Sequence, residues 1–231
     1  MVGLLTSLAL GGVTTMLNHH TYLKIIAECN FARPRVSNKQ IIAFANVSPA
    51  TVTEMTRQLQ KCGLVNRHRY TGVTLTDQGR ELATRLLYKY RLCEVFLAQH
   101  LHLPLSQIPE QAWQMADTLE PPTVTALATF LDHPQQSPFG GDMTTDLLND
   151  ATVMPLSQLS DRTPTKLVSY LETPSLVAYF QHCHLTINQP LWLLRRDEDL
   201  NFLYLETTAH EEIIVNLSAA DYLYVQKKPT N

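Results

Sequence analysis

Apolar side chains recur at helical spacing near the start of the chain. In residues 18–30, Tyr22, Ile25, Ile26 and Cys29 follow one another at intervals of three, one and three and form a single apolar stripe. This spacing predicts an amphipathic helix, because residues three and four apart share one face of a helix. We expect it to pack as the first helix of a small bundle.

Two helix-start signals follow in close succession. Ser37 has Gln40 three positions later, which is the pattern of a capping box and predicts a short helix. Ser48 precedes Pro49, so a capping hydroxyl stands before a proline at the first helical position. The second helix is expected to end near Gly63. Two helices joined by so short a turn predict a helix-turn-helix.

A hairpin and a long helix are predicted next. Residues 64–76 alternate apolar and polar side chains around the turn at 71–72, which predicts a two-stranded ribbon. We interpret this ribbon as the wing of a winged helix-turn-helix. Thr76 then gives a capping signal for a long helix that is expected to continue to about Leu101.

The second half of the chain is predicted to contain further helices followed by short strands. Helices are predicted over 104–119 and 122–131, and the segment 133–141 is so rich in proline and glycine that we interpret it as a domain boundary. A further helix is expected around 175–183. The predicted strands of the last third are 191–194, 201–205, 213–215 and 222–225. Short strands separated by polar turns predict a small antiparallel β-barrel.

Charge divides the chain in a way that the net value of -3 conceals. Residues 16–100 contain 12 Lys and Arg against 5 Asp and Glu, whereas residues 101–231 contain 6 against 16. The first part therefore carries about +7 and the second about -10. A basic segment attracts phosphates by releasing counterions, so the predicted winged helix-turn-helix is the part that we expect to approach a nucleic acid.

Several function classes are disfavoured by the residues. No nucleophile with a neighbouring base, phosphate-cradling glycine loop or recognisable carboxylate pair occurs in the sequence, so an enzyme is not expected. The four cysteines lack any C-x-x-C pair, which argues against a disulfide framework and a thiolate zinc site. Residues 1–12 lack the basic region of a signal peptide and are too short to span a bilayer, so we expect no membrane partner and a cytoplasmic protein.

The predicted second helix of the helix-turn-helix and the hairpin carry the candidate DNA contacts. In such a motif the second helix enters the major groove with its N-terminal residues at the base edges. The candidates for DNA contact are Ser48, Pro49, Ala50, Thr51, Thr53, Glu54, Arg57, Arg67 and Arg69. The small and methyl-bearing side chains suit thymine methyl groups, and the three arginines suit phosphates. For any one of these residues, the alternative is an ordinary solvated helix face.

Three stretches of the sequence resemble the diphtheria toxin repressor and manganese transport regulator family of metal-dependent transcriptional repressors. They are 47–55 (VSPATVTEM), 72–79 (GVTLTDQG) and 90–97 (YRLCEVFL), and the motif 137–141 (SPFGG) is similar to one at the end of a domain in that family. The resemblance implies an α+β fold with three parts: an N-terminal winged helix-turn-helix, a helical dimerisation domain and a small C-terminal SH3-like β-barrel. It also implies a homodimer that binds a double-stranded DNA operator.

Domain limits follow from this resemblance. We expect the winged helix-turn-helix over 16–77, the dimerisation domain over 78–141, a linker over 142–150 and the SH3-like domain over 151–231. Family members begin close to the position of Tyr22, which implies a natural start at Met16. Residues 1–15 are therefore interpreted as an extension that arises from a misplaced gene start.

The family's metal ligands are largely replaced in this sequence. The resemblance implies a primary site for Mn(II) or Fe(II) at the positions of Thr21, Trp113, Ala116 and Asp117, and an ancillary site at the positions of Tyr90, Glu94, Pro109, Glu172 and Ser175. Only Glu94, Asp117 and Glu172 retain carboxylates, and tryptophan and alanine supply no ligand atom. We therefore expect no bound metal cofactor, with the Trp113 side chain filling the volume of the ion.

The resulting hypothesis is a repressor of metal-transport or metal-homeostasis genes whose metal response is weakened or lost. One way to replace the metal would be an ion pair between Lys24 and Asp117. Two alternatives stay open: a regulator that senses a non-metal ligand near Trp113, and a protein-interaction module whose winged helix docks an acidic partner.

Overall fold

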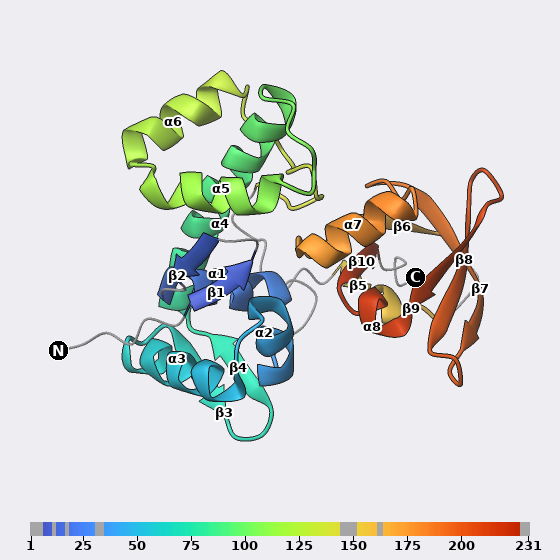
Figure 1. Cartoon of the computed structure of the whole chain (residues 1–231), viewed down its shortest axis with the longest axis horizontal. Coiled ribbons are helices and arrows are strands. Elements are labelled where there is room, and N and C mark those ends of the chain that lie inside the picture. The colour runs from blue at the N-terminus through green and yellow to red at the C-terminus, as the bar shows by residue number, and fades with distance from the viewer. Residues whose placement is uncertain are drawn as a thin grey trace. The chain divides into compact units, whose positions relative to one another are not determined.

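The computed structural model describes residues 7–10, 13–16, 19–30, 35–143, 152–160 and 164–226 (Figure 1). These residues fall into two compact units, of which the first extends to Leu87 and the second begins at Tyr88. Within the described ranges, no helix is both long and apolar enough to cross a membrane. Each unit is described separately below.

The first unit is a helical bundle with a hairpin on its side. Its elements are β1 (Ser7–Leu10), β2 (Val13–Met16), α1 (His19–Asn30), α2 (Asn38–Ala45), α3 (Pro49–Lys61), β3 (Val65–His68), β4 (Gly72–Leu75) and the first part of α4 (Asp77–Gln99). β1 and β2 pair antiparallel with each other, as do β3 and β4. The buried side chains of α1, α2 and α3 include Ile26, Ile41, Val52 and Leu59, and they form the centre of this bundle.

The predicted capped starts of α2 and α3 are confirmed. Ser37 caps α2 with a full capping box, because its hydroxyl accepts from the backbone of Gln40 while the Gln40 side chain accepts from the Ser37 backbone. Ser48 caps α3, and Pro49 stands at its first position. Asn46 ends α2 in the left-handed conformation, which produces the sharp turn of the helix-turn-helix.

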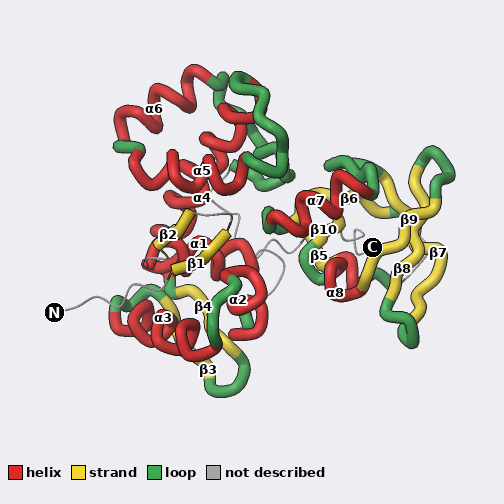
Figure 2. The backbone as a smooth tube through the Cα atoms, in the orientation of Figure 1, coloured by secondary structure: helices red, strands yellow, loops and turns green. Residues whose placement is uncertain are grey.

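The second unit combines helices with a six-stranded sheet. Its helices are the rest of α4, α5 (Ile108–Thr118), α6 (Pro121–Phe130), η1 (Leu156–Gln158), α7 (Pro174–His182) and α8 (Leu217–Ala220). Its strands are β5 (Val153–Pro155), β6 (Thr165–Tyr170), β7 (Pro190–Asp197), β8 (Phe202–Thr207), β9 (Glu212–Asn216) and β10 (Leu223–Gln226). All neighbouring strands pair antiparallel in the order β5-β10-β6-β7-β8-β9. Figure 2 shows the strands in yellow and the helices in red.

The predicted fold class is confirmed, with one correction to the sheet. The strand order begins at β5 and ends at β9, so within the described residues the sheet is open where a closed barrel was expected. Register shifts in β7 and β10 bend it as bulges do. The strands β7 to β10 match the four predicted segments, whereas β5 and β6 were not predicted.

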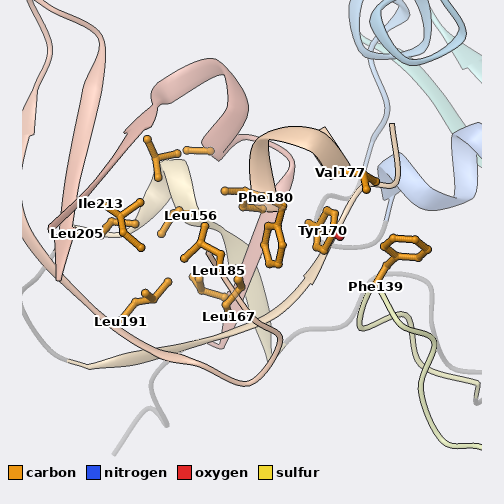
Figure 3. Packing of buried hydrophobic residues seen from close by; sticks show 14 of the residues in the cluster. Phe139, Leu156, Leu167, Tyr170, Val177, Phe180, Leu185, Leu191, Leu205 and Ile213 are labelled. Atoms are coloured by element: carbon orange, nitrogen blue, oxygen red, sulfur yellow. The ribbon is translucent and has the colours of Figure 1, made fainter. Parts of the chain in front are cut away.

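The proline- and glycine-rich segment after α6 forms a packed turn against the sheet. The Ser137 hydroxyl accepts from the backbone nitrogens of Phe139 and Gly141 at 3.2 and 3.3 Å. Phe139 is fully buried, and its ring meets that of Tyr170 edge to face at 5.6 Å (Figure 3). The Tyr170 backbone nitrogen also donates to the Phe139 carbonyl at 3.3 Å. This turn thus ties the helices of the second unit to β6.

Candidate nucleic-acid interface

Helix α3 presents one face to the bundle and the other to solvent. Val52, Thr56 and Leu59 are buried, and their spacing of four and three places them on one side. The N-terminal end is fixed by Ser48, whose hydroxyl accepts from the Thr51 backbone nitrogen at 3.1 Å and lies 2.8 Å from the Thr51 hydroxyl. The capping hydroxyl and the proline at the first position fix the conformation of the first turn of α3. A helix that contacts base edges with its N-terminal residues requires such a fixed first turn.

The outward face of α3 gathers most of the predicted contact residues. Pro49, Ala50, Glu54 and Arg57 are exposed, and Thr51 and Thr53 are half-buried. The Thr53 hydroxyl donates to the Pro49 carbonyl at 2.9 Å. Since this hydroxyl and that of Thr51 are engaged inside the helix, small apolar groups make up much of the surface of the first two turns.

An ion pair occupies the middle of the same face. The Arg57 Nη1 atom lies 2.8 Å from Glu54 Oε2, and Gln58 Nε2 donates to Glu54 Oε1 at 3.2 Å. The Gln58 Oε1 atom in turn lies 2.8 Å from Nε2 of His19, the first residue of α1. Sequence reasoning missed Gln58 and His19, because no local pattern indicates that the start of α1 meets α3.

The β3–β4 hairpin forms a cationic wing with an aromatic tip. Arg67 is half-buried and Arg69 is exposed. Tyr70 at the turn is 90% exposed and has a φ of 66°, and the Arg69 guanidinium lies 4.9 Å from its ring centre. Arg35, from the segment before α2, donates to the Thr71 hydroxyl at 3.4 Å. Tyr70 and Arg35 were not among the predicted contacts, although Tyr70 adjoins the predicted turn at 71–72.

The positions that the resemblance assigns to the primary metal site include an aromatic and an alanine side chain, which supply no ligand atom. In the second unit, Trp113 of α5 meets Tyr90 of α4 edge to face, with ring centres 5.7 Å apart. Ala116 is buried and Asp117 is exposed. Thr21 and Lys24 are buried residues of α1 in the first unit. The pairing of Lys24 with Asp117 stays a prediction.

Two positions of the implied ancillary site carry buried carboxylates that both act on one tyrosine. Glu94 and Glu172 are both buried, and both raise the pKa of the buried Tyr170 hydroxyl, after the larger effect of burial itself. Pro109 is half-buried within α5, and Ser175 is exposed in the first turn of α7.

The donor set does not fit a transition-metal ion. Across the described residues, no three His, Cys, Asp or Glu side chains lie close enough to share an ion. Manganese and iron sites in proteins use several carboxylate or imidazole ligands together, and an edge-to-face aromatic pair offers none. Burial and the Glu94 charge also raise the pKa of the neighbouring Cys93 thiol to about 12, so without an ion this sulfur is protonated near neutral pH.

Comparison with known proteins gives the family. Residues 14–73 match the family described as "Iron dependent repressor, N-terminal DNA binding domain", and residues 76–145 match "Iron dependent repressor, metal binding and dimerisation domain". The chain is 38% identical over 73 residues to the HTH-type transcriptional regulator MntR of Lysinibacillus sphaericus, a match that covers 32% of this chain and 50% of MntR.

Solved structures are similar over nearly the whole chain. The manganese regulator SloR is 30% identical, with a TM-score of 0.78 over 93% of this chain and all of SloR. The metal-dependent transcriptional regulator MtsR is 26% identical, with a TM-score of 0.81 over 90% of this chain and 98% of MtsR. These relatives are regulators and not enzymes. The chain therefore belongs to the iron-dependent repressor family and is a DNA-binding transcriptional regulator.

Proposed function

We propose that the protein is a cytoplasmic homodimer that represses genes of metal transport or metal homeostasis by placing α3 of each protomer in the major groove of a pseudo-palindromic operator. The observation that carries this proposal is the capped, outward face of α3 beside the cationic β3–β4 hairpin. In this assignment residues 16–77 bind DNA, 78–141 dimerise, 142–150 link, and 151–231 form the SH3-like domain.

Each predicted contact except Glu54, which is considered below, has a role in this proposal. Pro49, Ala50 and the methyl groups of Thr51 and Thr53 meet thymine methyl groups, since the hydroxyls of the two threonines already have partners within the helix or its cap. Ser48 holds the helix start in position. The residues that contact phosphates are Arg57, Arg67 and Arg69.

Joint neutralisation of these arginines tests DNA binding. The triple variant Arg57→Gln, Arg67→Gln and Arg69→Gln removes six phosphate contacts from a dimer. The slope of log affinity against log salt should fall by about 5, and affinity for every duplex should drop. The matched control neutralises the exposed cations Arg85, Lys166 and Arg195, which belong to α4, β6 and β7 and are not part of α3 or the hairpin.

Two results would count against the DNA-binding role. One is unchanged duplex affinity in the triple variant, and the other is an equal loss in the control. Absence of salt-dependent binding to any duplex by the wild-type chain would instead favour docking of an acidic protein.

We further propose that operator binding does not depend on a divalent metal, or depends on it only weakly. The support is the Tyr90–Trp113 aromatic pair, together with Ala116, at positions where the family places ligands. Two buried carboxylates remain, and without imidazole partners they would bind an ion weakly. A ligand other than a metal is the remaining candidate for an effector.

The metal proposal is tested by elemental analysis of the purified protein and by operator binding before and after chelation. We expect less than one equivalent of manganese or iron and the same operator affinity in both samples. A tenfold gain in affinity when Mn(II) or Fe(II) is added to chelated protein would show that a functional site persists.

A further inference from the structure

The outward face of α3 carries a carboxylate that is held in place from both sides. Glu54 accepts from Arg57 through one oxygen at 2.8 Å and from Gln58 through the other at 3.2 Å. His19 engages the opposite end of the Gln58 amide at 2.8 Å, so Gln58 is itself fixed. The side chains of Glu54 and Arg57 are still 50% and 52% exposed. The carboxylate is thus oriented but accessible.

A negative charge at this place opposes ordinary DNA binding. Every duplex presents phosphates to an approaching helix, and a carboxylate among them is repelled whatever the base sequence. Arg57 offsets part of this repulsion through its ion pair. The repulsion that remains weakens complexes with random sequence unless the carboxylate finds a hydrogen-bond donor.

The major groove offers one kind of donor to a carboxylate. Exocyclic amino groups are present on cytosine at N4 and on adenine at N6, whereas guanine and thymine present acceptors at the equivalent edge. An ionised carboxylate has about four acceptor positions, of which Arg57 and Gln58 use two. The hydroxyls of Thr51 and Thr53, by contrast, are already engaged within the helix.

We infer that Glu54 is a specificity-determining residue of α3: it accepts a hydrogen bond from an exocyclic amino group in the major groove and weakens binding to duplexes that lack one there. Arg57 and Gln58 are positioning residues for this carboxylate, and His19 supports Gln58. This inference rests on the proposed DNA-binding function and names the part of the site that discriminates between sequences.

The first experiment compares Glu54→Gln with Glu81→Gln. Glu81 is an exposed glutamate on α4 with an Arg85 partner at 3.5 Å, so its replacement makes the same charge change on a different helix. For Glu54→Gln we expect roughly threefold tighter binding to random duplex at low salt and a smaller ratio of specific to random affinity. Glu81→Gln should match the wild type. Equal behaviour of the two variants would overturn the inference.

The second experiment identifies the base that Glu54 contacts. A random duplex pool selected with the wild-type protein should show cytosine or adenine at one fixed position in each half-site, and Glu54→Gln should lose that preference. Replacing the base there with a pyrimidinone that lacks the 4-amino group, or a purine that lacks the 6-amino group, should weaken wild-type binding about tenfold. The analogue that has this effect identifies the base.

Replacement of the positioning residue Gln58 gives a separate test of the base preference. Gln58→Leu keeps the carboxylate but removes its second donor, so the base preference should weaken while random-duplex affinity stays close to the wild-type value. Unchanged preference in both Glu54→Gln and Gln58→Leu would refute the assignment. If the wild-type protein bound no duplex at all, the DNA-binding function would fail as well, which the triple arginine variant distinguishes.

Discussion

Gly140 lies where the fold leaves no space for a side chain. Its φ is 83°, and a Cβ atom there would overlap the Val168 carbonyl of β6. Gly140→Ala should therefore lower the free energy of unfolding by about 3 kcal/mol, combining left-handed strain with displacement of the sheet. Urea denaturation measures this loss.

Gly63 provides the control for this substitution. It also has a positive φ, of 72°, but a Cβ atom would meet only the Gln78 side chain at 3.4 Å. Gly63→Ala should lower the free energy of unfolding by about 1 kcal/mol, because only the strain of the left-handed conformation is added. Equal losses in the two variants would contradict close packing of the 137–141 turn against β6.

The buried Cys93 thiol should make stability depend on alkaline pH. Burial, then Glu94, raise its pKa to about 12, with a smaller lowering from Lys89, whereas an unfolded-chain thiol titrates near 8.5. Below pH 8.5 the thiol is protonated in both states. Between about pH 8.5 and 10 only the unfolded chain releases the proton, so stability falls as pH rises, by up to about 1.4 kcal/mol per unit.

Thermal unfolding across this pH range checks the sign. In Cys93→Ala the stability should fall less steeply as the pH rises. Cys62→Ala, which removes an exposed thiol, should show the same pH dependence of stability as the wild type. A slope that is the same in all three proteins would exclude Cys93 as its source.

Local sequence patterns predicted most of the exposed residues of α3 but few of the side chains that these residues contact. The capping hydroxyl of Ser48 and the exposed residues of α3 follow from spacing within one helix. The link from His19 to Gln58 joins residues 39 positions apart, and only the packed bundle brings them together. Glu54 could be predicted as exposed, but its fixed orientation could not.

At the scale of elements, the success of prediction depends on whether a strand has a polar face. β7 to β10 lie between clear turn signals and were predicted. In β6 the residues Thr165, Ser169 and Tyr170 are all buried, so polar side chains occupy covered positions and the alternation fails. β5 has three residues and ends in a proline, which gives almost no periodic signal.

The helix cap of α3 should matter for DNA binding as well as for stability. Ser48→Ala removes the bond from the Thr51 backbone, and Thr173→Ala removes the equivalent bond from Leu176 in α7. Each should lower the free energy of unfolding by about 1 kcal/mol. Only Ser48→Ala should weaken operator binding, by roughly fivefold, because α3 is the helix that we propose to place its first turn at the bases.

Denaturation and a duplex titration of both cap variants give the comparison. Similar operator affinities for Ser48→Ala and Thr173→Ala would mean that the start of α3 is not at the DNA. A loss confined to Thr173→Ala would place the contact in the other unit.

For the whole molecule, the distribution of charge in the sequence predicted where the helix-turn-helix and hairpin lie, whereas composition did not predict how the segment 133–141 packs. The basic part of the chain, residues 16–100, contains the helix-turn-helix and the hairpin, as the charge division predicted. The breaker-rich segment 133–141 has the composition of a solvated connection, yet Ser137 and Phe139 are buried. Composition cannot separate a linker from a turn packed against a distant strand, because the covering residues lie elsewhere in the sequence.

The helices of the second unit expose an aromatic group suited to a second copy of the chain. Phe130 of α6 is 61% exposed and contacts His100 and Phe96, with ring centres at 4.7 and 6.2 Å. The cluster lies within residues 76–145, the part that matches the dimerisation domain of the family. Exposed aromatic residues over an apolar base are typical of the centre of protein interfaces.

Phe130→Asp should therefore weaken the proposed homodimer at least tenfold, measured by sedimentation velocity, since a charge would be buried at the interface. Operator affinity should fall with it, because a monomer reaches only one half-site. Leu200→Asp is the control: Leu200 is 60% exposed but lies in the turn between β7 and β8, outside the dimerisation match. If both variants sediment as the wild type does, this helical face is not the dimer interface, and the two reading helices must be joined through another surface.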